Sequence, residues 1–409
     1  MTSPMTHAGL VARTEWVEDA ISLVDFAGDG GALFGHGGLT GLASRGVALR
    51  VRAGDAASVL AGIEADDGVG LPGCGPVAVG ALPFTGTSAG ELVVPREVLG
   101  REPDGRAWRT TIVGGAGRTA VAGDSPAGPP PLRAPDEFSL RPFPPHEEWC
   151  EAVAAAVAAI RNSHRTLVKV VLARQVLVEA NRPIHPARVA ARLGALYPSC
   201  MVFSIDGFVG ASPELLVSRR GNQVWSQPLA GTIPRSGDPD VDHRLAAELL
   251  DSSKERQEHA LVVDEVADRL RPHCESLSVP AVPEIVPLRN VSHLGTRISG
   301  RVGPAAPSAL GLALLLHPTP AVAGTPTTEA LAFLNQLEPG DRGRYTGPVG
   351  WMDARGDGDW AVAIRCAELD GHRARLYAGA GVVADSTPEA ELAETQLKLQ
   401  ALLAAVVRP

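Results

Sequence analysis

Short apolar runs separated by turn residues dominate this chain and predict many β-strands. From about residue 31 to residue 111, runs rich in Val, Leu and Ala alternate with Gly, Pro and Asp, which is typical of antiparallel strands joined by turns. Later in the chain, the Asp206-Gly207 pair separates two apolar runs and predicts a hairpin. Further strands are predicted at 167–178, 200–206, 208–219, 349–353, 360–369 and 374–384.

Three segments show the apolar spacing of helices instead. An alanine-rich helix is predicted at 148–160, a longer helical segment at 242–271 with a charged interruption at 251–259, and a last helix at 388–407. The sequence has no repeat of fixed period, and no GxGxxG motif opens a βαβ unit. We therefore expect an α+β fold, in which large and mostly antiparallel sheets pack together with helices on the outside.

A stretch rich in Gly and Pro divides the chain into two parts. Residues 114–145 have a composition typical of a linker or mobile loop. A strand-rich part, 1–113, precedes this stretch, and a mixed part, 146–409, follows it. A chain of 409 residues can form one large domain or two to three average ones, and we expect the two parts to be intertwined in one domain.

Composition and charge indicate which classes of molecule this protein can bind. The net charge of −9 does not suit a nucleic-acid surface, which needs clustered Lys and Arg, and an anionic ligand would need a local cationic or metal site. The five cysteines are scattered without a CxxC pair, and the N-terminus lacks the pattern of a signal peptide. The longest apolar runs, such as 310–316, are too short to span a membrane. We expect a cytoplasmic protein that binds neither nucleic acid nor membrane.

One segment near the C-terminus carries a charged motif beside two glycines. The sequence predicts an apolar strand, then a glycine turn, and then a helix with Ser386 as its N-cap. Glu391, Glu394 and Lys398 follow at i, i+3 and i+7, so they project from one helix face. Two carboxylates and an ammonium beside glycine N–H groups suit a carboxylate substrate held through a divalent metal. A solvated helix face with a Glu394–Lys398 pair fits the same pattern.

Polar residues also occur inside or beside other predicted apolar strands, where they form a series of short motifs. The motifs are Lys169-Val-Val-Leu-Ala-Arg174, Ser212-Pro-Glu214, Leu229-Ala-Gly-Thr232, Ser253-Lys-Glu-Arg-Gln-Glu-His259, Asn290-Val-Ser-His293, His317-Pro-Thr-Pro-Ala-Val322, Arg342-Gly-Arg-Tyr345 and Ala363-Ile-Arg365. In order and spacing, these motifs and the C-terminal helix resemble the chorismate-utilising enzymes over residues 148–409. Within that family the likeness is closest to the isochorismate synthases.

The same motifs indicate which nucleophile attacks chorismate. Lys169 resembles the base of family members that use water, and the branch that forms anthranilate lacks a lysine there. The branch that forms aminodeoxychorismate carries its nucleophilic lysine where this chain has Ala230, which leaves water as the incoming group. The motif at 317–322 resembles the isochorismate-synthase form. One departure is Ile233, where the common pattern has an arginine.

The resemblance and the chemistry together imply two catalytic residues. Moving the C4 hydroxyl of chorismate to C2 requires a base that deprotonates water and an acid that protonates the leaving oxygen on the opposite face of the ring. We predict Lys169 as the base, with a pKa lowered by its apolar neighbours, and Glu214 as the acid, with a raised pKa. The structural alternatives are a solvent-facing lysine at a strand edge and a solvated turn carboxylate.

A magnesium site and a set of substrate-binding residues are implied in the same way. Glu258 and Glu394 are predicted to hold Mg²⁺ against the C1 carboxylate, with Glu391 as a further ligand, whereas an ordinary helix-surface role is the alternative for Glu258. Arg365 and Tyr345 are expected to bind the enolpyruvyl carboxylate. The other residues expected to contact the substrate are Thr232, His293, Thr296, Ala321, Gly379, Gly381 and Lys398.

These predictions describe a Mg²⁺-dependent isochorismate synthase that feeds siderophore or menaquinone synthesis. We expect it to be monomeric or only weakly associated with downstream enzymes. Two alternatives stay open: a salicylate synthase would go on to expel pyruvate from isochorismate in the same pocket, and a non-catalytic homologue would only bind chorismate. The presence of Lys169, Glu214, Glu258 and Glu394 together argues against the second alternative.

Overall fold

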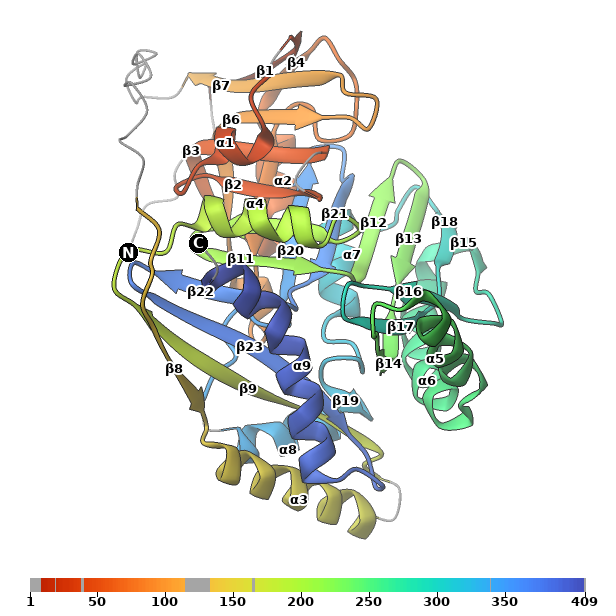
Figure 1. Ribbon diagram of the computed structural model, residues 1–409. Coiled ribbons are helices and arrows are strands. Elements are labelled where there is room, and N and C mark those ends of the chain that lie inside the picture. Colours follow the sequence, from red (N-terminus) through yellow and green to blue (C-terminus); the bar gives the residue numbers. More distant parts are fainter. Residues whose placement is uncertain are drawn as a thin grey trace.

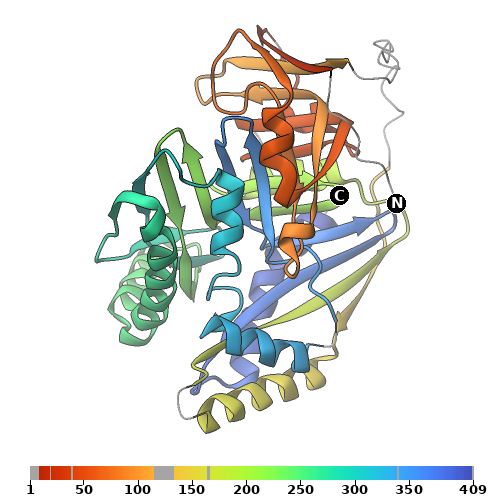
Figure 2. The same ribbon diagram turned by 180° about the vertical axis from the view of Figure 1, so that it is seen from behind.

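The computed structural model describes residues 9–18, 20–37, 40–114, 133–163, 166–338 and 340–407 (Figures 1 and 2). Its helices are α1 Leu23–Ala27, α2 Ala56–Ala61, α3 His146–Asn162, α4 Pro186–Leu196, α5 Pro239–Asp251, α6 Ser253–Leu270, α7 Ala309–Leu316, α8 Thr327–Leu337 and α9 Pro388–Val407. Its strands are β1 Leu10–Val17, β2 Ala32–His36, β3 Thr40–Arg52, β4 Glu64–Asp67, β5 Val77–Ala81, β6 Glu91–Arg101, β7 Ala107–Gly114, β8 Phe138–Phe143, β9 Lys169–Ala180, β10 Met201–Ile205, β11 Phe208–Ser212, β12 Leu215–Arg220, β13 Gln223–Gln227, β14 Leu229–Pro234, β15 Cys274–Ser278, β16 Glu284–Pro287, β17 Val291–Gly295, β18 Ile298–Val302, β19 Gly324–Thr325, β20 Pro348–Asp353, β21 Gly358–Val362, β22 Cys366–Asp370 and β23 Arg373–Val382.

The strands form an extended antiparallel framework with helices on its outer faces. Twenty strands belong to one hydrogen-bonded sheet, while β14, β16 and β17 form a separate three-stranded sheet. The long strands β9 and β23 pair over ten residues, and β1 with β4 is a parallel pair among otherwise antiparallel ones. Figure 1 shows α9 lying across β9 and β23, and α5 and α6 beside the small sheet. The predicted α+β class is confirmed.

Strands from both sides of the Gly/Pro-rich stretch pair directly with one another. β2 pairs with β10, and β5 pairs with β20. One apolar cluster accordingly combines Leu33, Val202 and Leu402. Part of the stretch predicted as a linker or loop is a strand, because β8 pairs with β9, whereas residues 115–132 lie outside the described part of the chain.

Three other predicted elements differ from the structure. The strand predicted at 208–219 is divided into β11 and β12, with Pro213 and Glu214 between them. The strand predicted at 360–369 is divided into β21 and β22, because Arg365 adopts a φ of 52° that interrupts the ladder. The helical segment predicted at 242–271 is two helices, α5 and α6, that meet at Ser252. The Ser252 hydroxyl caps α6 by accepting a hydrogen bond from the Glu255 backbone N–H. The hairpin at Asp206-Gly207 is present, formed by β10 and β11.

The framework brings two helices to one pocket. α6 packs against β14, and α9 packs against β23. Each helix therefore carries charged residues of its N-terminal half toward the ends of these strands, where the pocket lies. Among the helices of the described residues, none combines the length and the apolar character needed to cross a membrane.

Candidate active site

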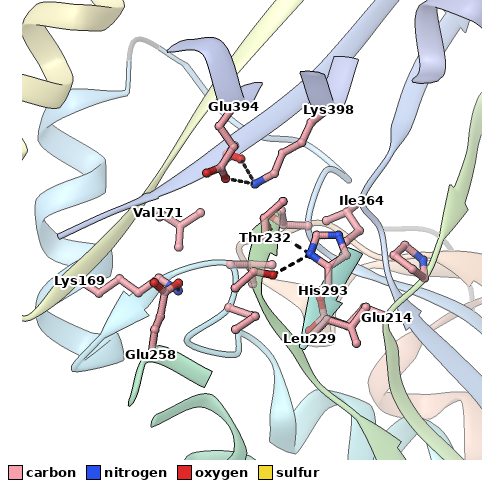
Figure 3. A pocket seen from close by; sticks show the side chains of 18 of the residues that line it. Lys169, Val171, Glu214, Leu229, Thr232, Glu258, His293, Ile364, Glu394 and Lys398 are labelled. Atoms are coloured by element: carbon pink, nitrogen blue, oxygen red, sulfur yellow. Dashed lines mark hydrogen bonds and ion pairs between the residues drawn. The ribbon is translucent and has the colours of Figure 1, made fainter. Parts of the chain in front are cut away.

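The predicted site residues come from distant parts of the chain and line one pocket, shown in Figure 3. Strands β9, β14, β17 and β23 form its walls together with α6 and α9. The predicted residues that line it are Lys169, Glu214, Thr232, Glu258, His293, Ala321, Tyr345, Arg365, Gly379, Gly381, Glu391, Glu394 and Lys398. Thr296 is not part of the lining: it is buried, and its hydroxyl lies 2.7 Å from Nε2 of His259. Thr296 thus supports the helix that carries Glu258.

Lys169, at the start of β9, is buried in an ion pair. Its Nζ donates to Oε1 of Glu258 at 2.7 Å, and the two side chains are 5 % and 18 % exposed. The solvent-facing alternative for Lys169 is therefore excluded, and Glu258 is not an ordinary surface residue of α6. The ammonium is buried, and the carboxylate of Glu258 compensates its charge.

Gly379 and Gly381 lie inside β23, so the predicted glycine turn is wrong. A Cβ atom at Gly381 would lie 2.7 Å from Cε of Lys169, and one at Gly379 would lie 3.0 Å from the Tyr345 hydroxyl. The first distance is too short for a real Cβ atom, so the end of the Lys169 side chain would have to move, and the second is tighter than most real contacts. The two glycines therefore leave room for Lys169 and Tyr345 on this face of the sheet.

Glu214 is fully enclosed beside the pocket. It follows β11, and the Ser212 hydroxyl accepts a hydrogen bond from its backbone N–H while donating to the carbonyl of Val362. Burial raises the pKa of Glu214 to about 8, although a backbone hydrogen bond from Leu229 and the charge of Lys169 act in the opposite direction. The solvated-turn alternative is excluded, and the carboxyl group can be protonated at neutral pH.

His293 on β17 is held as a neutral imidazole with a defined tautomer. Its Nδ1 lies 2.9 Å from the carbonyl oxygen of Gly231, an acceptor only, so the proton is assigned to Nδ1. Nε2 is then free to accept a hydrogen bond from Nη2 of Arg365 at 3.3 Å. Burial lowers the pKa of His293 to about 3, and the positive charge of Arg365 adds to this effect. Thr232 also contacts Nδ1, at 3.2 Å (Figure 3).

Arg365 contacts this histidine, and Tyr345 lines the same pocket. The positive φ of Arg365 is rare for a residue with a side chain and turns the chain between β21 and β22. Its backbone carbonyl accepts a hydrogen bond from Ala211. Tyr345 stacks on Tyr377 with ring centroids 5.0 Å apart, and burial raises its pKa, so the phenol stays protonated. Arg365 thus offers a cation and Tyr345 a neutral donor to an anionic ligand.

The charged face of α9 points into the pocket. Nζ of Lys398 donates to Oε1 of Glu394 at 2.5 Å and to the carbonyl of Gly379 at 2.9 Å, so Lys398 both pairs with Glu394 and lines the pocket. Burial acts to raise the pKa of Glu394, but the charge and hydrogen bond of Lys398 outweigh it and the pKa is lowered. Burial raises the pKa of Glu391.

The predicted N-cap of this helix is displaced by one residue. α9 begins at Pro388, and the Thr387 hydroxyl accepts a hydrogen bond from the Ala390 N–H. Ser386 instead donates to Oε1 of Glu391 at 2.7 Å. It therefore orients a pocket carboxylate rather than capping the helix.

Two charged residues of the pocket were missing from the predicted set. Lys254 and Glu255 lie in the first turn of α6 and line the same pocket. Burial and the negative charge of Glu258 raise the pKa of Glu255. The spacing of Glu255 and Glu258, at i and i+3, is the sequence signal that could have identified Glu255.

The donor chemistry of the pocket fits a hard divalent cation. Glu255 and Glu258 on α6 and Glu391 and Glu394 on α9 supply oxygen ligands of the kind that Mg²⁺ prefers. Glu394 raises the pKa values of both Glu255 and Glu391, so these carboxylates are close enough to repel one another. Within the described residues, no three His, Cys, Asp or Glu side chains are already arranged as a metal site, since Glu258 and Glu394 are turned toward lysines.

The fold and this pocket place the chain in a defined class of enzymes. It belongs to the chorismate binding enzymes, because the family model of that description matches residues 125–407, more than half of the chain. Its relatives include the isochorismate synthase DhbC of Bacillus subtilis, which is 41 % identical over 343 residues that cover 81 % of each chain.

Solved structures agree with this assignment. A putative 2,3-dihydroxybenzoate-specific isochorismate synthase, DhbC from Bacillus anthracis, is 35 % identical with a TM-score of 0.77, covering 94 % of this chain and 98 % of the other. MenF, the menaquinone-specific isochorismate synthase from Escherichia coli, is 25 % identical with a TM-score of 0.83, covering 98 % of this chain and 95 % of the other. The predicted family is confirmed.

Proposed function

We propose that this protein is an isochorismate synthase, which converts chorismate reversibly to isochorismate. The observation that carries the proposal is that one pocket holds a buried lysine, Lys169, and a buried, protonatable glutamate, Glu214. Ala230 also lines this pocket, so no amine nucleophile stands at that position. Water is then the group that enters.

The reaction needs one proton removed and one proton supplied. Lys169 in its neutral form takes a proton from water as the new C2–O bond forms. Glu214 in its protonated form gives a proton to the C4 oxygen as the C4–O bond breaks, so one water enters and one leaves. The ammonium of Lys169, which pairs with Glu258, must lose its proton before it can act as the base.

The remaining polar groups suit the two carboxylates of chorismate. Arg365 and Tyr345 would bind one of them, with neutral His293 holding the guanidinium in place through Nε2. Glu258 and Glu394, with Glu391 through water, would hold Mg²⁺, which would supply the charge that neutralises the C1 carboxylate. Lys398, by pairing with Glu394, keeps that carboxylate oriented toward the pocket.

Product analysis tests the proposal directly. Purified protein incubated with chorismate and Mg²⁺ should give isochorismate, separated from chorismate by chromatography, without release of pyruvate. Salicylate together with pyruvate would identify a salicylate synthase instead, and unchanged chorismate would identify a non-catalytic homologue. We further propose a monomeric, cytoplasmic enzyme. We also propose that its product enters siderophore or menaquinone synthesis, and the relatives named as 2,3-dihydroxybenzoate-specific and menaquinone-specific support this second part.

A further inference from the structure

The distribution of lysine in this chain is very uneven. The sequence contains 34 arginines but only three lysines, Lys169, Lys254 and Lys398. All three lysines line the same pocket. Wherever else this chain places a permanent positive charge it uses arginine, so each lysine is expected to meet a need that is specific to the pocket.

Two of the lysines have evident partners, and the third does not. Lys169 pairs with Glu258, and Lys398 pairs with Glu394. Lys254 is exposed, and its side chain makes no hydrogen bond or ion pair with any residue that the structure describes. Contacts within the folded protein therefore do not explain why a lysine stands at this position.

The position of Lys254 on its helix is also unfavourable. It is the second residue of α6, where the N-terminal end of the helix dipole repels a cation and favours Asp or Glu. Neighbouring Glu255 follows that rule, whereas Lys254 does not. Helix stability therefore gives no reason for this lysine either.

The surroundings of Lys254 place its charge at the edge of the carboxylate group. Its positive charge acts to lower the pKa values of Glu255 on α6 and Glu391 on α9. An exposed ammonium here gives local positive potential to a protein whose net charge is −9. A dianionic ligand repelled by the protein as a whole would meet this charge while entering the pocket.

We propose that Lys254 is a substrate-capture residue, whose ammonium contacts a carboxylate of the dianionic substrate at the opening of the pocket. The inference rests on the proposed function for the identity of that substrate. A lysine suits this role because its compact, hydrated charge on a flexible stem can exchange partners. A guanidinium at this position could instead form forked ion pairs with Glu255 or Glu391, whose pKa values the charge of Lys254 lowers, and so hold its charge away from the substrate.

Steady-state kinetics of three variants at varied ionic strength test the proposal. Lys254→Ala should lower kcat/KM about tenfold at low salt, mainly through KM, and should weaken the salt dependence of kcat/KM. Lys254→Arg should restore the salt dependence of kcat/KM, because the charge is kept, but should restore only part of the affinity for the substrate. Arg256→Ala removes an exposed cation from the same turn of α6, outside the pocket, and should behave as wild type. An unchanged salt dependence in Lys254→Ala would overturn the proposal.

A labelling experiment separates this proposal from the proposed function. Lys169 and Lys398 are largely enclosed, so Lys254 is the lysine open to an amine-acylating reagent. Chorismate, with or without Mg²⁺, should slow acylation of Lys254 relative to the N-terminal amine, as measured by peptide mass spectrometry, whereas sulfate of equal ionic strength should not. If chorismate protects Lys254 but is not converted, the proposed synthase activity is rejected and the capture role of Lys254 is kept. If chorismate is converted normally but does not protect Lys254, the synthase activity is kept and the capture role is rejected.

Discussion

The side chain of Lys169 occupies the space that Gly381 leaves open on the neighbouring strand. A Cβ atom at position 381 would lie 2.7 Å from Cε and 3.3 Å from Nζ of Lys169, and 3.5 Å from Oε1 of Glu258. The proposed base is therefore positioned by the absence of a side chain as much as by its partner carboxylate. β9 and β23 are paired at this point, so the strands cannot separate easily to relieve a contact.

Gly381→Ala should consequently displace Lys169 and lower kcat by one to two orders of magnitude, about 10–10²-fold, because small misplacement of a reacting group is costly. The far-ultraviolet circular dichroism should stay that of the wild type. Gly30→Ala is the matched control, since a Cβ atom there meets no atom within 4 Å. Wild-type kcat in Gly381→Ala would contradict this account of the glycine.

Substitutions at Lys169 separate its charge from its basicity. Lys169→Met should lower kcat by about 10²–10⁴-fold, because water activation is lost. Lys169→Arg keeps a cation for Glu258 but cannot deprotonate near neutral pH, so it should be almost as inactive. The measurement is kcat with chorismate at saturating Mg²⁺. An active arginine variant would show that the ion pair, rather than a base, is what the reaction needs.

The pKa of Glu214 predicts a limit to activity at high pH. The acid must be protonated to act, and its pKa is about 8, so kcat should fall as the pH rises through that value. Glu214→Gln should be slow throughout and should lack this basic limb. A pH–rate profile from pH 6 to 10 measures both. Full activity of Glu214→Gln at pH 7 would exclude Glu214 as the acid.

The same group links stability to pH. The pKa of Glu214 is raised from 4.5 to about 8 in the folded protein, so between these values the folded state holds more protons than the unfolded state. Stability should therefore decline as the pH rises from about 4.5 to 8. Glu214→Gln should remove this decline and melt at a higher temperature than wild type at pH 8, with a smaller difference at pH 5. Glu248→Gln, an exposed carboxylate on α5, serves as the control.

Metal dependence is testable by binding as well as by rate. EDTA should abolish turnover and added Mg²⁺ should restore it. Glu258→Gln and Glu394→Gln should each weaken Mg²⁺ binding in calorimetric titration, since each removes a charged oxygen ligand. Glu389→Gln, an exposed glutamate on α9 outside the pocket, should bind as wild type. Full activity of a metal-free preparation would reject the magnesium assignment.

The origin of the product oxygen distinguishes water attack from a shift of the existing hydroxyl. In ¹⁸O-labelled water, isochorismate should carry the label at C2, as measured by mass spectrometry of the product. This follows from the proposed mechanism, in which Lys169 activates water, since Ala230 offers no amine to the same pocket. An unlabelled product would remove the role assigned to Lys169.

Sequence patterns identified the paired strands and the buried polar residues, but not the local geometry. Lys169 and Glu214 were recognisable because each is a charged residue among apolar neighbours, and the structure buries both. The glycine content of the C-terminal segment predicts a turn, whereas Gly379 and Gly381 lie inside β23 and leave room for side chains from other parts of the chain, which local spacing does not encode.

Lys254 and the break at Arg365 escaped prediction for related reasons. Lys254 is an exposed charge on a helix, and such residues are usually without a specific role, so only the pocket that forms around it sets it apart. The apolar spacing of 360–369 continues through Arg365, and nothing in that spacing signals a positive φ. Both features arise from tertiary structure rather than from local preference.

The left-handed backbone at Arg365 has a consequence for how this protein can be evolved. A non-glycine residue in that conformation costs of the order of 1–3 kcal/mol, and glycine would adopt it without that cost. A laboratory selection for heat resistance alone would therefore favour Arg365→Gly, while removing the guanidinium that contacts His293. Selection schemes need to impose turnover of chorismate together with temperature if this position is to be kept.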